Sequence, residues 1–328
     1  MTTEAEPQPA ARPRIALALG SGGARGYAHI GVIQVLEERG FDIVTVAGSS
    51  MGALVGGVHA AGRLADYTEW AMGLSRADVL RLLDPAIAAP GAIRAEKIFT
   101  RVRELLQGVL IEQLPVPYTA VATDLLARKE VWFQDGPLAV AIRASVAIPG
   151  VITPVMLNGR LLADGGLMNP VPIAPTAAVH VDATVAVSLG GERRGFSGVP
   201  DRETSASRPV EEWAERFRRT AASWLDRDVI RSVTNRFGSQ HSPADHSDDE
   251  FGELPAGLGR IDVFTQSLEV VESVLTRYRL AGYPPDVLIT IPKDACRSLE
   301  FYRAGEMIEL GRAAAAEALD QAGLMTSG

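Results

Sequence analysis

The sequence predicts an α/β protein in which a mainly parallel central sheet carries helices on both faces. Residues 15–19 form a short apolar run, which ends in a glycine-rich loop and continues into a helical pattern over 27–39. Residues 43–47 repeat this order, with a second glycine-containing loop at 48–52 and a helix of small residues over 53–61. Two successive strand-loop-helix units are typical of a parallel sheet with helices packed on its faces.

Further elements follow in an order that fits one large domain. Asn158-Gly159 is a strong hairpin signal between two short strands, and the second of these strands leads into Asp164. We predict a flexible tail over 1–13 and one domain over 14–325, with mobile loops at 191–209 and 240–256. The other predicted strands are 118–123, 130–133, 185–189 and 286–291, and the other predicted helices lie within 64–107, 138–146, 211–237 and 300–321.

The composition indicates a globular enzyme and argues against several kinds of partner. The chain has 328 residues, a formal net charge of −8 and a pI near 5.3, which disfavours broad electrostatic binding to nucleic acid. Cys296 is the single cysteine, so an internal disulfide and a multi-cysteine metal site are excluded. The sequence lacks a signal-peptide core and a membrane-spanning apolar run, so we expect a cytoplasmic protein with at most peripheral membrane contact.

The motif Gly48-Ser49-Ser50-Met51-Gly52 has the form Gly-x-Ser-x-Gly. A serine hydroxyl becomes a nucleophile when a base removes its proton and its oxygen is held exposed, and a tight strand-to-helix turn holds it in this way. The helix that follows also directs free N–H groups and its positive dipole end at the reacting centre. The pattern also occurs in turns without function, but the preceding strand and following helix favour Ser50 as a nucleophile.

The loop over residues 20–26 reads Gly-Ser-Gly-Gly-Ala-Arg-Gly. The dinucleotide fingerprint Gly-x-Gly-x-x-Gly does not fit this loop in either alignment. If the motif begins at Gly20, its last glycine position holds Arg25. If it begins one residue later, its first glycine position holds Ser21. A P-loop is excluded because no Gly-Lys-Ser/Thr follows. The loop is therefore either a plain tight turn or a set of backbone N–H groups that converge on an oxyanion, with Arg25 adding positive charge.

Asp164 is a candidate base for a serine nucleophile. It stands at the end of a predicted strand, in the sequence Asp164-Gly165-Gly166. Asp-Gly is also a common turn pair, so the motif in isolation favours an ordinary turn. A carboxylate at a strand end becomes the better candidate because the histidines offer little competition.

None of the five histidines has a recognisable catalytic setting. Two of them, His29 and His59, lie inside helical patterns, where ordinary packing is the better interpretation. The other three lie near a helix end or in an acidic segment, at His180, His241 and His246. The sequence therefore favours a serine enzyme that works without a catalytic histidine.

The three motifs together resemble those of patatin-like phospholipases, in particular the compact bacterial members related to the catalytic domain of neuropathy target esterase. Their order and spacing agree with the family pattern, and Ser21 is a departure, since many relatives have glycine there. The resemblance extends over about residues 14–190, with a weaker similarity at 286–311. The matching segments are 21–26, 48–52 and 164–166, with support from 122–125, 143–150 and 169–172.

The resemblance implies a patatin-like three-layer sandwich and a hydrolase of carboxylic esters of lipids, of phospholipase A or lysophospholipase type, without a cofactor or metal. It assigns Ser50 as the nucleophile and Asp164 as the base. The same site also serves a thioesterase or a transacylase, and a non-catalytic regulatory protein can retain the fold. The implied oxyanion hole consists of Gly22, Gly23 and Arg25, and the remaining motif residues are Gly48, Gly52, Gly165 and Gly166.

Residues 211–237 suggest a second contact with lipid. Trp213, Phe217 and Trp224 fall near one stripe of the predicted helix, and arginines outnumber the acidic residues around them. Such a helix lies on an anionic lipid surface with its aromatic side chains toward the membrane, or it packs against the domain with its arginines in water. The sequence leaves both arrangements open.

Overall fold

A computed structural model of the chain describes residues 12–82, 91–93, 95–191 and 260–324, and these residues belong to one compact unit. Gly191, predicted as the first residue of a loop, is instead the last residue of strand β9 (Ala183–Gly191). Several predicted features lie outside the described residues: the tail up to residue 11, the loops at 192–209 and 240–256, the helix at 211–237, and His241 and His246.

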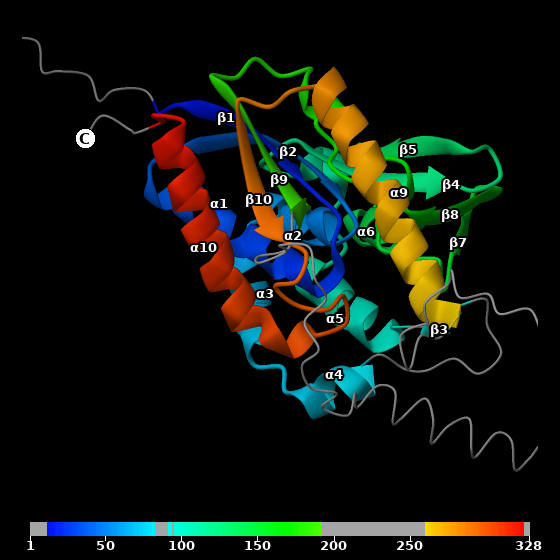
Figure 1. The fold of residues 1–328 in the computed structure, drawn as a ribbon. Helices are drawn as coiled ribbons and strands as arrows, with labels where there is room; N and C mark the ends of the chain where they lie inside the picture. The colour runs from blue at the N-terminus through cyan, green and yellow to red at the C-terminus, as the bar shows by residue number, and fades with distance from the viewer. Residues whose placement is uncertain (1–11, 83–90, 94, 192–259, 325–328) are drawn as a thin grey trace, which may run out of the picture. The chain divides into compact units, whose positions relative to one another are not determined.

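The central sheet has the strand order β10-β9-β1-β2-β4-β8-β7, with β5 paired to β4 as well (Figure 1). The strands from β10 to β4 run parallel, and β5, β8 and β7 add antiparallel pairs. The predicted mainly parallel sheet is therefore confirmed. The strands are β1 (Arg14–Leu19), β2 (Asp42–Ser49), β4 (Tyr118–Asp124), β5 (Lys129–Phe133), β7 (Val155–Leu157), β8 (Arg160–Asp164), β9 and β10 (Val287–Pro292).

Helices cover the sheet on both faces (Figure 1). They are α1 (Ala28–Glu38), α2 (Met51–Ala60), α3 (Leu64–Met72), α4 (Arg76–Leu82), α5 (Glu96–Leu106), α6 (Leu138–Ser145), α9 (Arg260–Gly282) and α10 (Ala304–Gln321). Short 3₁₀ helices are η1 (Gly23–Tyr27), η2 (Ile111–Gln113), η3 (Gly165–Leu167), η4 (Ala174–Thr176) and η5 (Phe301–Arg303). None of the described helices is both long enough and apolar enough to cross a membrane.

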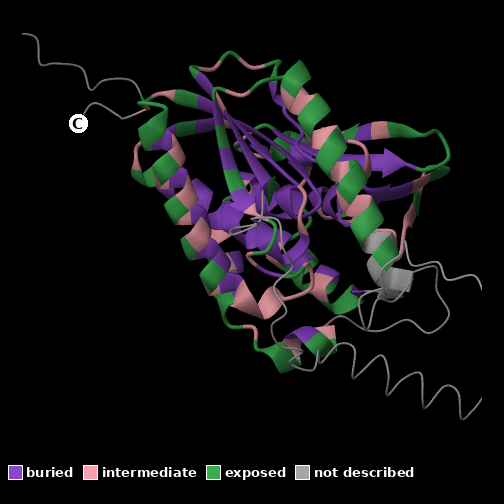
Figure 2. Cartoon of the chain, viewed as in Figure 1, coloured by how far each residue is buried: buried purple, intermediate pink, exposed green. Residues whose placement is uncertain are grey.

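The alternation of side chains along β1 shows how the layers are held together. Leu17 and Leu19 point to one face, where they join the main hydrophobic core with residues of α1, α2 and α10. Ala18 points to the other face, where it packs with Val171 and with Leu280 of α9. The inner parallel strands β9, β1, β2 and β4 are largely buried on both faces, as their colour in Figure 2 shows, which explains their nearly continuous apolar sequences. The edge strand β10 instead alternates buried and exposed residues.

Helices α1 and α10 approach each other so closely that glycine is required at the contact. A Cβ on Gly31 would lie 2.0 Å from the Ile308 carbonyl oxygen, and a Cβ on Gly311 would lie 2.0 Å from the Ala28 carbonyl oxygen. Real non-bonded carbon and oxygen atoms do not approach to this distance, so any larger residue must push the helices apart. This contact fixes the C-terminal helix against the first helix of the chain.

We expect Gly311→Ala to lower the stability of the protein by about 1–3 kcal/mol, because the added methyl group overpacks this contact. Thermal unfolding followed by circular dichroism measures the effect. Gly305→Ala on the same helix is the control, because a Cβ there meets nothing within 4 Å. It should leave the melting temperature unchanged or slightly raised, since alanine favours helix. Equal melting temperatures for the two variants would contradict the close contact.

The structure contains two features that the sequence pattern does not predict. One is α9, a helix of 23 residues, and the other is a two-stranded sheet of β3 (Gly91–Ile93) and β6 (Gly150–Ile152). The apolar residues of α9 do not form one clear stripe, since Val270 and Val271 are exposed although Leu280 packs on the sheet. Strands β3 and β6 have only three residues each, which is too short for an alternating pattern.

Candidate active site

Strands β2 and β8 meet end to end along one edge of β4. Strand β5 pairs with residues 120–124 of β4 and so occupies the opposite edge. On the shared edge, the last residue of β2, Ser49, lies opposite Val121, and the last residue of β8, Asp164, lies opposite Ala122. Because β2 is parallel to β4 and β8 is antiparallel to it, the two strands run toward each other. The register therefore brings the turn at Ser50 to the Asp164 carboxylate.

Ser50 lies at the sharp turn between β2 and α2, with φ 56° and ψ −123°. A non-glycine residue in such a conformation costs about 1–3 kcal/mol, and the surrounding contacts must hold it there. The Ser50 N–H donates to Ser145 Oγ at 2.9 Å, and Ser145 Oγ in turn donates to the Val121 carbonyl at 2.6 Å. The turn is thus fixed to α6 and to the central strand β4.

The glycines of the Ser50 turn are required by close packing. A Cβ on Gly52 would lie 2.1 Å from the Leu19 carbonyl oxygen at the end of β1, and a Cβ on Gly48 would lie 2.3 Å from the Gly52 carbonyl oxygen. Only glycine therefore lets α2 begin directly against the sheet. The first N–H groups of α2 remain next to Ser50 as hydrogen-bond donors and as the positive end of the helix dipole.

Asp164 is held at the end of β8 by three hydrogen bonds. Its N–H donates to the Ala147 carbonyl at 2.9 Å, its carbonyl accepts from Thr123 Oγ1 at 2.9 Å, and its Oδ1 accepts from the Gly166 N–H at 2.8 Å. The Oδ2 atom is buried and has no hydrogen-bond partner among the described residues. The contacts orient the carboxylate and leave one oxygen available to accept a proton.

Burial raises the pKa of Asp164 to about 6, and the nearby Ser50 hydroxyl and the Gly166 N–H offset part of this rise. The side chain is ionised above that pH and is a stronger base than an ordinary aspartate. A closely packed backbone supports it, since a Cβ on Gly165 would lie 2.1 Å from the Val121 carbonyl oxygen. Asp164 therefore combines a raised pKa with a carboxylate oxygen that has no partner among the described residues, which makes it the candidate base.

The glycine-rich loop is tied down at some backbone groups and open at others. The N–H groups of Gly20, Ser21 and Ala24 donate to the carbonyls of Val187, Pro170 and Ser298. Those of Gly22 and Gly23 have no acceptor among the described residues. These two N–H groups are therefore available to an oxyanion.

Arg25 holds this loop in place from within the fold. It is 8% exposed, and its guanidinium donates to the Gly22 carbonyl at 3.2 Å and to the Lys293 carbonyl at 2.6 Å. These two bonds join the loop to the end of β10. The predicted oxyanion-hole role of Gly22, Gly23 and Arg25 stays a prediction, in which Arg25 contributes charge from a fixed position.

The histidines of the described residues lie in non-catalytic settings. His29 is fully buried, and its Nε2 lies 2.8 Å from the Gly20 carbonyl oxygen, so it donates to the loop backbone. Burial lowers the pKa of His29 to about 4 and that of His59 to about 4 as well. His59 is near Glu37, and His180 is exposed. His29 thus supports the glycine loop as a neutral side chain.

Three further residues belong to this region, although the sequence motifs do not identify them as such. Ser145 holds the Ser50 N–H, and Thr123 holds the Asp164 carbonyl. Both lie inside segments that resemble the family, but a lone serine or threonine there gives no signal of its contact. The third is Glu272 on α9, whose carboxylate lies beside Gly166. The available signal for α9 was a stretch of more than 20 residues without proline.

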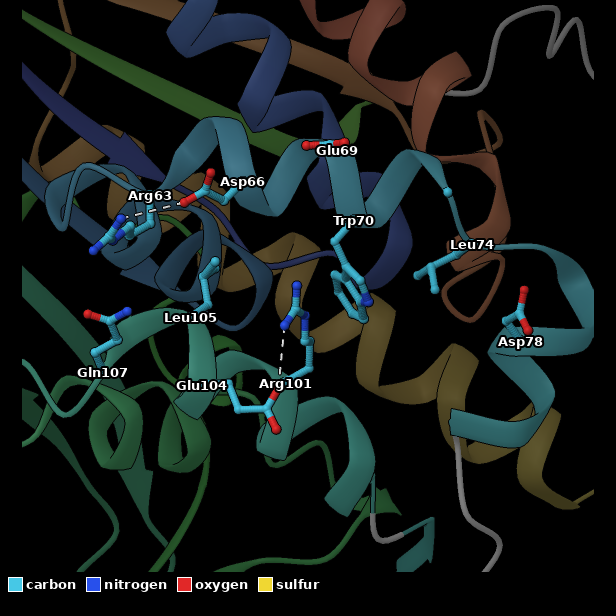
Figure 3. Close-up of a pocket in the computed structure, with 11 residues that line it drawn as sticks. Arg63, Asp66, Glu69, Trp70, Leu74, Asp78, Arg101, Glu104, Leu105 and Gln107 are labelled. Atoms are coloured by element: carbon cyan, nitrogen blue, oxygen red, sulfur yellow. Dashed lines mark hydrogen bonds and ion pairs between the residues drawn. The ribbon is translucent and has the colours of Figure 1, made fainter.

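A groove of about 720 Å³ lies between α3, α4 and α5 (Figure 3). Four of its charged residues form two ion pairs within it, Arg63 with Asp66 and Arg101 with Glu104. The groove contains none of the residues described above as candidates for catalysis. The volume of this groove therefore does not point to the candidate catalytic residues.

Comparison with known proteins supports the family resemblance. Residues 17–177 match the family model described as patatin-like phospholipase. An uncharacterized NTE family protein of Mycobacterium tuberculosis is 51% identical over 335 residues, which covers 94% of this chain and 92% of that protein. The human patatin-like phospholipase domain-containing protein 6 is 33% identical over 186 residues, which covers 54% of this chain and 13% of the human protein.

A solved structure gives a weaker likeness. VipD from Legionella pneumophila superimposes with a TM-score of 0.47 at 16% sequence identity, covering 94% of this chain and 67% of that one. The matched family segment contains the glycine loop, the Ser50 turn and Asp164, whereas α9 and α10 lie after it.

Proposed function

Because the chain belongs to the NTE family of patatin-like phospholipases, whose activity is lipid acyl hydrolysis, we propose that it cleaves carboxylic esters of lipids with Ser50 as nucleophile and Asp164 as base. The reaction is of phospholipase A or lysophospholipase type. The observation that carries the proposal is the end-to-end meeting of β2 and β8 on β4, which brings the two side chains together. No histidine is needed in this arrangement.

The reaction proceeds in two halves. Asp164 accepts the proton of the Ser50 hydroxyl while Oγ attacks the ester carbonyl carbon, and the carbonyl oxygen becomes an oxyanion. The protonated Asp164 then gives its proton to the alkoxide oxygen as the bond from that oxygen to the carbonyl carbon breaks. The alcohol departs, and the acyl group stays bonded to Ser50 Oγ. In the second half Asp164 accepts a proton from water, the hydroxide attacks the acyl-enzyme, and the fatty acid leaves as Ser50 is protonated again.

The oxyanion is stabilised by backbone groups in this proposal. The N–H groups of Gly22 and Gly23 are the proposed donors, and the beginning of α2 adds the positive end of a helix dipole. Arg25 holds the loop that carries these donors. Fixed donors of this kind need no rearrangement when charge develops, which is why they lower the barrier.

A lipid panel tests the proposed activity and separates it from its alternatives. Diacyl phospholipid, lysophospholipid, acylglycerol and acyl thioester are each incubated with the wild type and with Ser50→Ala, and the products are identified by mass. We expect a free fatty acid from an oxygen ester with the wild type alone. Preferred cleavage of the thioester, or transfer of the acyl group to an added alcohol, would instead assign a thioesterase or a transacylase.

Two predictions concern the surroundings of the enzyme. Peripheral membrane contact through residues 211–237 falls outside the described residues, and it stays a prediction that co-sedimentation with anionic vesicles at low salt addresses. The cytoplasmic location also stays a prediction. Neither is needed for the chemistry at Ser50 and Asp164.

A further inference from the structure

Helix α9 lies against the proposed active site and helps to bury it. Ser50 is 3% exposed and Asp164 is 4% exposed, so the two reacting groups are not open to a lipid in this arrangement. Helix α9 contacts η3, the turn that directly follows Asp164. An ester can reach Ser50 only after something beside the site has moved.

The side chain of Glu272 is the part of α9 that comes closest to this turn. Its Oε1 lies 2.9 Å from the position of a Cβ on Gly166, and Ser21 Oγ lies 2.5 Å from the same position. Gly166 donates its N–H to Asp164 Oδ1 at 2.8 Å. The Glu272 carboxyl group therefore lies next to the glycine that orients the base, against the loop that would hold the oxyanion.

More negatively charged groups than positively charged groups lie close to Glu272. The groups that face it are Asp164 from β8, Arg25 from η1 and Glu269 from its own helix. Burial and the negative charge of Asp164 raise the pKa of Glu272 to about 8, and Arg25 offsets part of this rise. The pKa of Asp164 is lower, about 6, so near neutral pH Asp164 is ionised while Glu272 keeps its proton.

The inner face of α9 has its described polar and apolar contacts near the C-terminal end of the helix. In the C-terminal half, Arg279 pairs with Glu130 of β5 and donates to the Met168 carbonyl, and Leu280 packs on the sheet. The outer face of α9 is exposed along the helix, at Val270 and Val271 and also at Val274 and Tyr278, and green marks this face in Figure 2. Among the described residues, no hydrogen bond or ion pair involves the Glu272 carboxyl group, and Arg279 lies about two turns further along the helix. Glu272 can therefore move away from Gly166 without breaking such a bond, while Arg279 keeps its contacts.

We infer that Glu272 is a gating residue: its carboxyl group, carried by α9, closes the space beside Asp164 and Gly166, and it must leave before an ester reaches Ser50. The inference rests on the proposed function for the identity of the substrate, but the position of Glu272 does not. A proton on Glu272 keeps the closed arrangement, because it avoids a second buried negative charge beside Asp164. Loss of that proton favours opening.

The direction of the pH dependence follows from linkage. The closed state binds the Glu272 proton more tightly than the open state does, because the pKa in the closed state is raised to about 8 from an ordinary value of 4.5. The closed state is therefore fully favoured at pH values below the ordinary pKa of 4.5. It weakens progressively as the pH rises toward about 8, and the opening equilibrium levels off above that pH.

The test compares the wild type with Glu272→Gln, which keeps the size and polarity of the side chain but cannot ionise. Two quantities are measured from about pH 5 to about pH 9: hydrogen exchange of α9, corrected for the intrinsic rate, and the rate at which a fluorophosphonate probe labels Ser50. The ratio of wild-type to Glu272→Gln labelling rates should rise at least about tenfold over this range. Exchange of α9 should rise with pH in the wild type alone.

Two further variants sharpen the test. Glu269→Gln, one turn earlier on α9, should keep a rise close to that of the wild type with only a small displacement to lower pH, because Glu269 is the smallest of the charges that raise the pKa of Glu272 and its carboxylate is not the one at Gly166. Asp164→Asn removes the charge that helps to raise the pKa of Glu272, so the rise of α9 exchange should move to lower pH. This second result is read from hydrogen exchange and requires no activity.

The outcomes separate the gating inference from the proposed function. If Ser50 is labelled but the wild type and Glu272→Gln give the same profiles for labelling and for α9 exchange, Glu272 does not gate the site. If α9 exchange follows the expected pH dependence but Ser50 is not labelled at any pH, the gating contact stands and the nucleophile is wrong.

Discussion

Ser50→Ala is expected to lower kcat for a short-chain nitrophenyl ester by roughly 10³-fold or more while the protein stays folded. The reason is that the hydroxyl oxygen is the only atom of the turn proposed to bond to the acyl group. Alanine fits the same space, and the N–H contact of residue 50 with Ser145 Oγ does not involve the lost oxygen. Steady-state kinetics and circular dichroism measure the two quantities.

Ser49→Ala is the matched control, since it removes the neighbouring hydroxyl from the same motif. The Ser49 hydroxyl donates to the Asn169 carbonyl at 2.6 Å inside the fold, so its loss should cost stability, about 1 kcal/mol, and leave most of the activity. If Ser50→Ala keeps wild-type turnover, or if Ser49→Ala loses as much activity as Ser50→Ala does, the assignment of the nucleophile is wrong.

Asp164→Asn is expected to reduce kcat/KM by a similar factor, roughly 10³-fold or more, because the amide cannot accept the Ser50 proton. The Asn side chain can still accept the Gly166 N–H, so the turn after β8 should keep its shape. Asp124→Asn is the control: this aspartate is also buried at a strand end, but its Oδ1 accepts the N–H groups of Leu126 and Ala127. Comparable losses for both variants would indicate a structural effect.

The same substitution should change the response to pH. In Glu272→Gln, in which residue 272 does not titrate, kcat/KM should fall about tenfold for each pH unit below about 6, where Asp164 becomes protonated. The pKa of Asp164 is raised in the folded state, so its ionisation reduces stability as the pH rises from the ordinary value through about 6. Asp164→Asn should therefore be more stable than the wild type by about 2–3 kcal/mol above this range. A lower melting temperature for Asp164→Asn than for the wild type would contradict burial as the cause of the raised pKa of Asp164.

Much of the first half of the fold could be predicted from sequence because its signals are local. The runs at 15–19 and 43–47 are apolar and are followed by glycine loops, and the structure has β1 and β2 there. Asn158-Gly159 predicts the β7–β8 hairpin by turn chemistry alone. Helix α9 escapes the same reasoning, because it carries exposed valines along its outer face and its apolar residues form no clear stripe.

The candidate site shows the same division between local and distant information. Ser50 and Asp164 stand in recognisable motifs, so each could be named from its own neighbours in sequence. Their meeting depends on the register of β2 and β8 along β4, which no local pattern specifies. Glu272 could not be found at all, since its position depends on how a distant helix packs against Gly166.

The placement of Ser50 and Asp164 on two strands that abut along β4 has a consequence for how this fold can diversify. Most of the chain between them, including α3, α4 and α5, lies outside the ladder that sets their separation. Insertions, deletions or exchanged helices in that stretch can reshape the acyl-binding surroundings without altering the distance between nucleophile and base. Related chains can thus acquire new substrates there while the reaction chemistry is inherited unchanged.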